Sequence, residues 1–411
     1  LAVWALGGAV ALIGAFCFGE LGDRIPKAGG GYVYLRDAFG PLPAFLYAWA
    51  LLLVIATGAI AAVAVTFANY TVALLGVSER LTTPLAIGAI LLLSAINYVG
   101  VKPGAVTQNI FTILKLVAIA GLVVTGLAFA GAGTGHATVE SLQPPEVPHG
   151  FVGVGVAIAS ALSPVLFAYG GWQQTNYIAE EIIDVRRNLP RALVLGVVVV
   201  VVSYLLVNIT YLTTLSAPGL AASTAPAADA MRAVFGATGA GLISAGIAIS
   251  TFGFLNLVIL VTPRVYQTMA SDGLFFPAIA RLHPKHRTPT VAITFQAAWA
   301  ILLTVSGTYG ELLDYVVFGD WVFFGLTVAT LFVYRARDRA AGTDPTPQDR
   351  FRVPGYPLIP GLFVMTAVYV VAGSIETNPG NAARGAALLA LGVPVFYFWK
   401  RRVAKKVRSE E

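Results

Sequence analysis

A polar interruption within a long hydrophobic stretch is the clearest candidate for chemistry in this sequence. Residues 151–183 are mostly apolar, yet they include Pro164, the pair Gly170 and Gly171, and several side-chain amides. A glycine costs about 1 kcal/mol in a helix interior, and a proline forfeits a backbone hydrogen bond, so a helix should break here. Unwinding around residues 168–173 would free N–H donors that suit a carboxylate and C=O acceptors that suit an ammonium group. The stretch therefore predicts a site for a ligand that carries both groups, as an amino acid does. The alternative is a Pro-Gly kink used only for packing.

Two charged residues lie deep in other apolar stretches. Lys115 stands about 15 Å from the nearer end of its predicted helix at 1.5 Å per residue, too deep for its side chain to reach the interface. A charge at this depth costs several kcal/mol unless it is paired, so it predicts a functional or charge-replacing role. Asp320 lies near the middle of its own stretch. Its carboxylate could line a ligand pocket, pair with a cationic ligand, carry a coupling proton or form a salt bridge.

Three acids, Glu20, Glu180 and Glu181, lie where apolar stretches end. Basic residues follow them closely in the sequence: Arg24, Arg186 and Arg187. We expect ion pairs among these groups that help to close one face of the protein, rather than direct contacts with a ligand.

The composition identifies the class of protein that must position these residues. Of the 411 residues 57% are hydrophobic and only 11% are charged, about half the charged fraction of a soluble domain. Apolar runs of about 20 residues predict helices that cross a membrane, since lipid satisfies no backbone groups. The sequence predicts an all-α polytopic membrane protein with eleven spans: 1–22, 41–66, 84–100, 105–130, 151–183, 191–215, 237–270, 289–307, 309–334, 356–376 and 383–400.

The distribution of basic residues predicts the orientation. When the spans are placed in alternation, all but four of the 26 lysines and arginines fall on one side of the membrane. Arg80, Arg232 and Arg384 fall on the other side, and Lys115 lies inside a span. The positive-inside rule makes the first side cytoplasmic and places the C-terminus there. The net charge of +6 is therefore a topology signal, and no nucleic-acid partner is expected.

Connection lengths predict an inverted repeat. A long, an intermediate and a tight connection follow the first span, and the same order recurs five spans later on the opposite side of the membrane. This is the pattern of many secondary transporters, whose broken helices meet at the midplane. We expect residues 1–130 to be the remainder of a first repeat, 151–334 a second repeat, 356–400 two further helices and 401–411 a basic tail. The broken partner of 151–183 would then precede Leu1.

Several motifs resemble the amino acid–polyamine–organocation superfamily, and within it most closely the L-type amino acid transporter branch. The motifs occur in the order typical of that superfamily: Trp4–Gly8, Gly19–Tyr34, Phe167–Trp172 with Glu180 and Glu181, Asn188–Arg191, Thr251–Gly253 with Asn256, and Asp272–Gly273 before Thr288–Pro289. The resemblance covers nearly the whole chain. It implies a twelve-helix transporter with a 5+5 inverted repeat, of which helices two to twelve are present.

The resemblance also implies roles for individual residues. In the family, the phenylalanine that matches Phe167 caps the substrate, and the aromatic that matches Trp172 lines the pocket. The family lysine that matches Lys115 places its ammonium where sodium-coupled relatives bind a cation, so sodium coupling is not expected. The partner of that lysine would be Ser250 or Thr251. The full substrate site that the resemblance implies comprises Phe167, Ala168, Tyr169, Gly170, Gly171, Trp172, Asn256 and Asp320.

Other partners and chemistries find no support in the sequence. Eukaryotic L-type transporters join a heavy subunit through a cysteine after the third helix. The matching residues 76–83 contain none, so no disulfide-linked heavy subunit is expected. We expect no cofactor and no metal, because the four histidines fall in loops without metal-ligand spacing. The sequence thus predicts an amino acid exchanger of the inner membrane. A proton-coupled symporter is the alternative, and an intramembrane enzyme is a more distant one.

Overall fold

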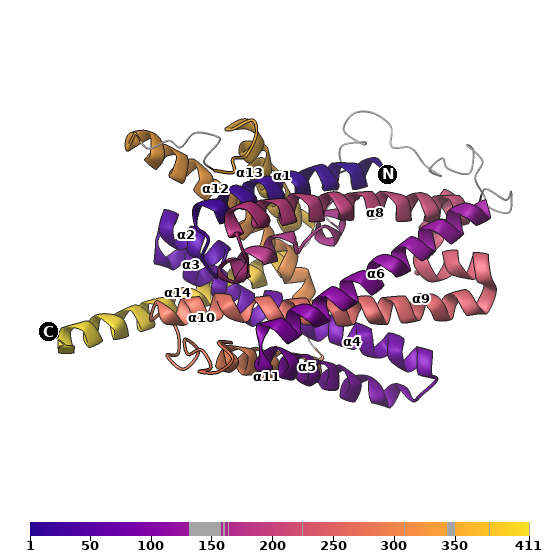
Figure 1. The fold of residues 1–411 in the computed structure, drawn as a ribbon, viewed down its shortest axis with the longest axis horizontal. Coiled ribbons are helices and arrows are strands. Elements are labelled where there is room, and N and C mark those ends of the chain that lie inside the picture. The colour runs from indigo at the N-terminus through magenta and orange to yellow at the C-terminus, as the bar shows by residue number, and fades with distance from the viewer. Residues whose placement is uncertain are drawn as a thin grey trace.

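The computed structural model describes residues 1–130, 158, 161–162, 164–223, 225–307, 309–342, 350–377 and 379–410, with side chains for all of these except 309–317, 377 and 404–410. The described elements are helices (Figure 1). The α-helices are α1 (Ala2–Arg24), α2 (Gly31–Phe39), α3 (Pro41–Ala50), α4 (Ala56–Leu75), α5 (Thr82–Val99), α6 (Val101–Phe129), α8 (Val185–Ala222), α9 (Pro226–Val261), α10 (Pro263–Ser271), α11 (Thr290–Ser306), α12 (Tyr309–Ala340), α13 (Leu358–Thr377) and α14 (Pro379–Glu410). A π-helix η1 (Leu51–Ile55) and the 3-10 helices η2 (Glu79–Leu81) and η5 (Trp172–Glu181) complete the set.

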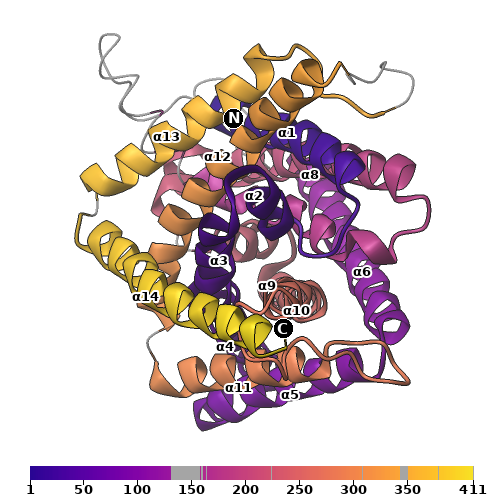
Figure 2. The ribbon, with the colours of Figure 1, turned by 90° about the vertical axis from the view of Figure 1, so that its left-hand side faces the viewer.

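Long apolar helices dominate the fold and make it a multi-pass membrane protein. Within the described residues, eight helices are long and apolar enough to cross a membrane, and α11 is a shorter apolar helix. Every predicted span outside 151–183 corresponds to a helix, with ends that differ by several residues. Figure 2 looks along the long helices and shows α9 and α10 near the centre, with the other helices around them. The predicted start of the second repeat, at residue 151, lies outside the described residues.

Two helices contain kinks where the sequence predicts span ends. Ser216 in α8 has φ +64°, and Gly236 in α9 has φ +62°, so neither residue continues the helix. The predicted spans 191–215 and 237–270 stop and start at these residues. The segment between them, predicted as a long connection, instead forms further helical turns in the described part.

Helices α3 and α4 are joined by the π-helical turn η1 at Leu51–Ile55. A π-turn holds one extra residue and leaves backbone carbonyls without their usual α-helical donors, which is costly inside a membrane. Side-chain donors reach three successive carbonyls of this turn: Tyr266 Oη to Leu51 O at 3.4 Å, Thr57 Oγ1 to Leu52 O at 2.7 Å and Trp299 Nε1 to Leu53 O at 3.0 Å. Partners from α10 and α11 therefore stabilise the turn.

Small residues allow α1 to pack closely against its neighbours. A Cβ added at Gly8 would come within 2.8 Å of Val201 on α8, and one at Gly7 within 2.7 Å of Val165. Figure 1 shows α1 and α8 side by side along most of their length. Cys17 of α1, the one cysteine of the sequence, is fully buried in this packing.

Candidate functional site

The chain leaves α-helical geometry between Ala168 and Trp172. Residues 164–168 are helical, residues 169–171 form a turn, and the 3-10 helix η5 begins at Trp172. The Gly170 N–H donates to Phe167 O, only three residues back, at 3.0 Å. Gly171 takes φ +100°, a conformation that an L-residue with a Cβ rarely adopts. The helix is therefore interrupted within the predicted range, and Gly171 is the position that requires a glycine.

The protein itself already binds two of the backbone groups at this break. The Tyr204 hydroxyl of α8 donates to Ala168 O at 3.0 Å. The Gly171 N–H donates to the side-chain Oε1 of Gln173 at 3.1 Å. The prediction that a ligand binds all of the freed groups is therefore wrong for these two. The N–H groups of Tyr169 and Gln174 are bonded within the chain as well, to Val165 O and Gly171 O.

Phe167 and Tyr169 lie in different surroundings although only one residue separates them. Phe167 is 49% exposed, whereas Tyr169 is 4% exposed. The Tyr169 hydroxyl donates to Trp4 O at 3.0 Å, and its ring centroid lies 5.1 Å from that of Tyr204. Tyr169 therefore anchors the break to α1 and α8, whereas the ring of Phe167 is half-exposed.

Trp172 points toward α1, α12 and α13. Its ring meets that of Phe18 edge-on with centroids 5.0 Å apart, and a Cβ added at Gly14 would overlap it. A cavity with an empty volume of about 230 Å³ lies next to this ring. The residues that line the cavity are Ala11, Leu166, Tyr169, Gly170, Trp172, Trp321, Phe324 and Phe363. The lining of this cavity is mostly apolar and includes Gly170 of the break.

Tyrosines from the chain before α4 hold the 3-10 helix η5. Tyr34 Oη donates to Asn176 Oδ1 at 2.9 Å, and the hydroxyls of Tyr47 and Tyr177 lie 2.6 Å apart. The Gly29 N–H also donates to Tyr177 O at 3.0 Å. Sequence reasoning missed these contacts. The available signal was the group of tyrosines around Gly29, because a buried hydroxyl needs a hydrogen-bond partner.

Helices α6 and α9 pack against each other in an antiparallel register. A Cβ added at Gly253 would lie 2.8 Å from Phe111, and one at Gly246 would lie 3.6 Å from Ala118. As residue numbers rise along α6, the numbers of the facing residues on α9 fall by the same amount. This register fixes which residues of α9 lie level with the middle of α6.

Lys115 lies level with residue 249 in this register, next to Ser250. Lys115 and Ser250 are both partly exposed. The Thr251 hydroxyl donates within its own helix, to Ile247 O at 2.8 Å and Ala248 O at 3.0 Å. The Thr251 oxygen can still accept a hydrogen bond, so both predicted partners stay predictions. Among the side chains that the structure describes, none forms a hydrogen bond or an ion pair with Lys115.

Asn256 belongs to a buried polar network rather than to the break. It is fully buried, and its amide donates to Gly104 O at 3.0 Å and to Gln108 Oε1 at 3.1 Å. Its Oδ1 accepts from Asn97 Nδ2 at 3.0 Å. These bonds join α5, α6 and α9. These bonds give Asn256 a role in helix packing, and its predicted place in the substrate pocket stays a prediction.

Asp320 lies on α12 near the tyrosine pair that holds η5. Its carboxylate interacts electrostatically with the hydroxyls of both Tyr47 and Tyr177. Within the described part of the chain, Asp320 forms no ion pair and no hydrogen bond. The structure therefore brings this acid near Tyr47 and Tyr177. That it lines the substrate site stays a prediction.

Comparison with known proteins identifies the family. Residues 1–396 match the family model described as amino acid permease. The chain belongs to the amino acid permease family. This permease is 32% identical over 420 residues to the b(0,+)-type amino acid transporter 1 of Homo sapiens, covering 99% of this chain and 83% of that protein. It is 31% identical over 421 residues to the Large neutral amino acids transporter small subunit 2 of Homo sapiens, covering 98% and 74% respectively. It is therefore a transporter and not an enzyme.

One end of the permease carries a buried ion-pair network centred on Glu20. Its Oε1 accepts from Arg24 Nε at 2.9 Å and from Arg335 Nε at 3.0 Å, and its Oε2 accepts from the Val353 N–H at 2.8 Å. Arg24 also pairs with Asp338 at 2.6 Å. The predicted Glu20–Arg24 pair is therefore present, and the network joins α1 to α12 and to the chain before α13.

Glu181 pairs with a different arginine from the one that the sequence suggested. Its Oε1 accepts from Arg264 Nε at 3.0 Å, whereas Arg186 and Arg187 were the expected partners. The 3-10 helix and the turn after it carry Glu181 toward α10. The contact still fulfils the expected type of role, since it ties the broken segment to another helix.

A further polar cluster connects α2 with α10. Tyr32 Oη donates to Asp272 Oδ2 at 2.7 Å, and Arg36 pairs with the same oxygen at 2.5 Å. Burial first, and the Asp272 carboxylate second, raise the pKa of Tyr32, so its hydroxyl remains a donor across the physiological range. The cluster fixes α2, which lies within the connection that the sequence placed at 23–40, to the end of α10.

Proposed function

We propose that this permease exchanges amino acids across the membrane by alternating access. The observation that carries the proposal is the interruption of the chain at residues 169–171 within a bundle of membrane-crossing helices. Irregular backbone at that depth is tolerated where it is buried in protein or lines a cavity. Both relatives are named as amino acid transporters, which supports amino acids as the substrate class.

The proposed site uses the break and the residues around it. Peptide groups around Gly170 would exchange their present partners for the ammonium and carboxylate of the substrate, and Phe167 would cover it. Trp172 and Asp320 would line the part of the substrate site that faces η5. We also propose that residues 1–130 are the remainder of a first inverted repeat, 151–334 a second repeat, 356–400 two further helices and 401–411 a basic tail.

Transport is proposed to be independent of sodium. A lysine ammonium next to Ser250 would supply a permanent positive charge between α6 and α9. Sodium-coupled transporters fill such positions with the cation itself. Lys115 has no ion-pair partner among the described residues, which leaves its ammonium for a role of this kind.

No disulfide-linked partner is proposed, although one relative is named a small subunit. The one cysteine in the sequence, Cys17, is fully buried within α1. A disulfide to another chain requires an accessible thiol. Electrophoresis of membranes without cross-linker or reducing agent should therefore show the permease at its own mass. Adding a reducing agent should not shift this band. We also place the permease in the inner membrane with its C-terminus in the cytoplasm, on the basis of the positive-inside rule.

Counterflow into proteoliposomes tests the proposal. The complete natural chain is reconstituted in liposomes preloaded with one unlabelled amino acid at a time, and entry of labelled amino acid is followed. An exchanger should give uptake that requires an internal amino acid and is unchanged when choline replaces sodium. Uptake into empty liposomes that follows an imposed proton gradient would indicate symport instead. Accumulation driven by a sodium gradient would contradict the proposal.

A further inference from the structure

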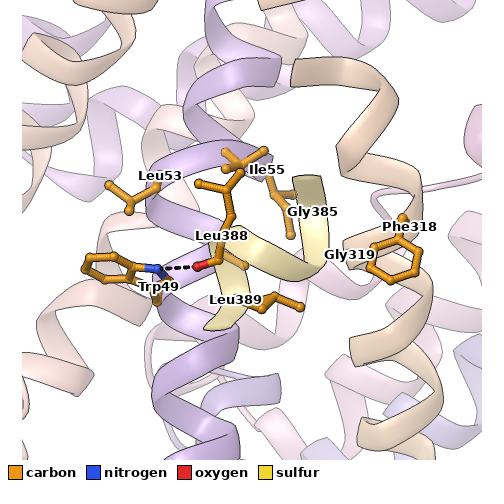
Figure 3. Close-up of a pocket in the computed structure, with 10 residues that line it drawn as sticks. Trp49, Leu53, Ile55, Phe318, Gly319, Gly385, Leu388 and Leu389 are labelled. Atoms are coloured by element: carbon orange, nitrogen blue, oxygen red, sulfur yellow. Dashed lines mark hydrogen bonds between the residues drawn. The ribbon is translucent and has the colours of Figure 1, made fainter. Parts of the chain in front are cut away.

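An apolar pocket lies between three helical segments away from the break. Figure 3 shows it between the α3–η1 region, α12 and α14, with an empty volume of about 360 Å³. The residues that line it are Trp49, Ala50, Leu53, Val54, Ile55, Phe318, Gly319, Gly385, Leu388 and Leu389. Glycines at 319 and 385 leave room between α12 and α14, and the π-turn forms the opposite wall.

The chemistry of this pocket selects an apolar occupant. None of its lining residues is charged. The one side-chain donor, Trp49 Nε1, is already bonded to Leu388 O at 3.1 Å, as the dashed line in Figure 3 shows. A polar ligand would lose its hydrogen bonds to water here without replacing them. A hydrocarbon chain matches this lining chemically, and the membrane around the bundle supplies hydrocarbon chains.

Basic residues follow on the helix that forms one wall of the pocket. Lys400, Arg401 and Arg402 lie on α14, with the Arg402 guanidinium 5.2 Å from the Phe398 ring centroid. At 1.5 Å per residue, Lys400 lies roughly 16 Å along the helix from Leu389. This separation is close to the thickness of one hydrocarbon leaflet, about 15 Å. A lipid whose phosphate contacts these cations can therefore reach the pocket with its acyl chain.

We propose that the pocket and the basic end of α14 together bind one anionic phospholipid. The phosphate contacts Lys400, Arg401 and Arg402, and an acyl chain fills the space beside Trp49 and Leu389. Cationic side chains near a membrane attract anionic lipids at about fivefold in affinity per residue. A zwitterionic lipid gains no such attraction, so headgroup charge distinguishes this site from general lipid contact. The proposal concerns binding and does not depend on the transported substrate.

Quenching of Trp49 by brominated lipid tests the position of the acyl chain. The complete natural chain is placed in phosphatidylcholine bilayers that contain a small fraction of phosphatidylglycerol with bromine near the chain end. The wild type should lose more fluorescence than Trp49→Phe, and the difference should vanish when brominated phosphatidylcholine is used at the same fraction. Equal quenching by both lipids, or no difference between the wild type and Trp49→Phe, would overturn the proposal and indicate general lipid contact only.

Paired variants test the two halves of the site by lipid retention in native mass spectrometry. Arg401→Gln with Arg402→Gln should weaken retention of phosphatidylglycerol by about 25-fold, since each cation contributes about fivefold. Arg80→Gln, at an exposed arginine in η2, is the matched control and should change nothing. Gly385→Phe should displace the chain, whereas Gly380→Phe on the same helix has open space around its Cβ and should not. If Gly385→Phe does not fold, the arginine pair still decides, and unchanged retention in that pair contradicts the proposal.

Discussion

Charged residues within the helices of this permease differ in how completely they are bonded. Glu20 has no exposed surface, and both of its carboxylate oxygens accept bonds from Arg24, Arg335 and the Val353 N–H. Lys115 and Asp320 lie within helices of the bundle, yet in the described part of the chain neither forms an ion pair. Moving a charge out of water costs free energy for all three residues. Only Glu20 offsets this cost through ion pairs and hydrogen bonds with neighbouring groups.

The difference distinguishes charges that stabilise the fold from charges that are available for transport. A charge whose partners are all fixed by the fold stabilises one arrangement of helices. A charge left without a fixed partner can interact with a substrate, a proton or a helix that moves. We therefore expect Glu20 to stabilise one end of the permease, and we propose that Lys115 and Asp320 act in the transport cycle.

The largest effect is expected for Glu20→Gln. This change leaves Arg335 and Arg24 buried beside a neutral amide, and breaking a buried pair costs about 3–5 kcal/mol. Thermal unfolding of the purified protein in detergent should therefore show a clearly lower midpoint. Glu79→Gln, at an exposed glutamate, is the control and should leave the midpoint unchanged. An unaltered midpoint in Glu20→Gln would show that Glu20 does not stabilise the fold.

Lys115→Ala should act on transport and spare the fold. Loss of the ammonium leaves the space beside Ser250 without its charge, and exchange should fall by about tenfold or more, which corresponds to about 1.4 kcal/mol or more. Initial exchange rates in proteoliposomes, corrected for the amount of reconstituted protein, measure this. Lys102→Ala, at an exposed lysine on the same helix, should exchange like the wild type. A large loss of thermal stability in Lys115→Ala would make its role structural.

Asp320→Asn should have a smaller effect, because the amide keeps the shape and removes only the charge beside Tyr47 and Tyr177. We expect exchange to fall by roughly threefold to fivefold, equivalent to about 1 kcal/mol or slightly less. Asp229→Asn, at an exposed ion pair at the start of α9, is the matched control. A wild-type response to an imposed pH gradient that this variant loses would identify Asp320 as a proton carrier.

Asp37→Asn should have the smallest effect of all. Asp37 and Arg337 lie 3.5 Å apart, and each side chain is 53% exposed. Exposed pairs contribute about 0–1 kcal/mol, so the unfolding midpoint should stay within experimental error of the wild type. A shift as large as that of Glu20→Gln would show that burial is not what separates the strong pair from the weak one.

Hydropathy predicted most of the helices but not how they are rotated. Apolar runs give the depth of a residue in the membrane, so Lys115 and Asp320 could be recognised as buried charges. The break could be located because proline and paired glycines act locally. The partner of Glu181 could not be predicted, since the rotation of η5 turns it toward Arg264 instead of its neighbours in sequence. The packing role of Asn256 depends on three helices meeting, which no local pattern records.

The π-turn at Leu51–Ile55 also determines how the preceding helix, α3, is rotated about its own axis. One extra residue rotates every preceding position by about 100° around the helix axis relative to an uninterrupted α-helix. Tyr47, whose hydroxyl lies against that of Tyr177, owes its facing direction to this offset. Deleting a single residue from the turn would leave the hydrophobic length almost intact and swing Tyr47 away from the broken segment. The number of residues in this turn therefore matters for the packing of this permease as much as the identity of their side chains.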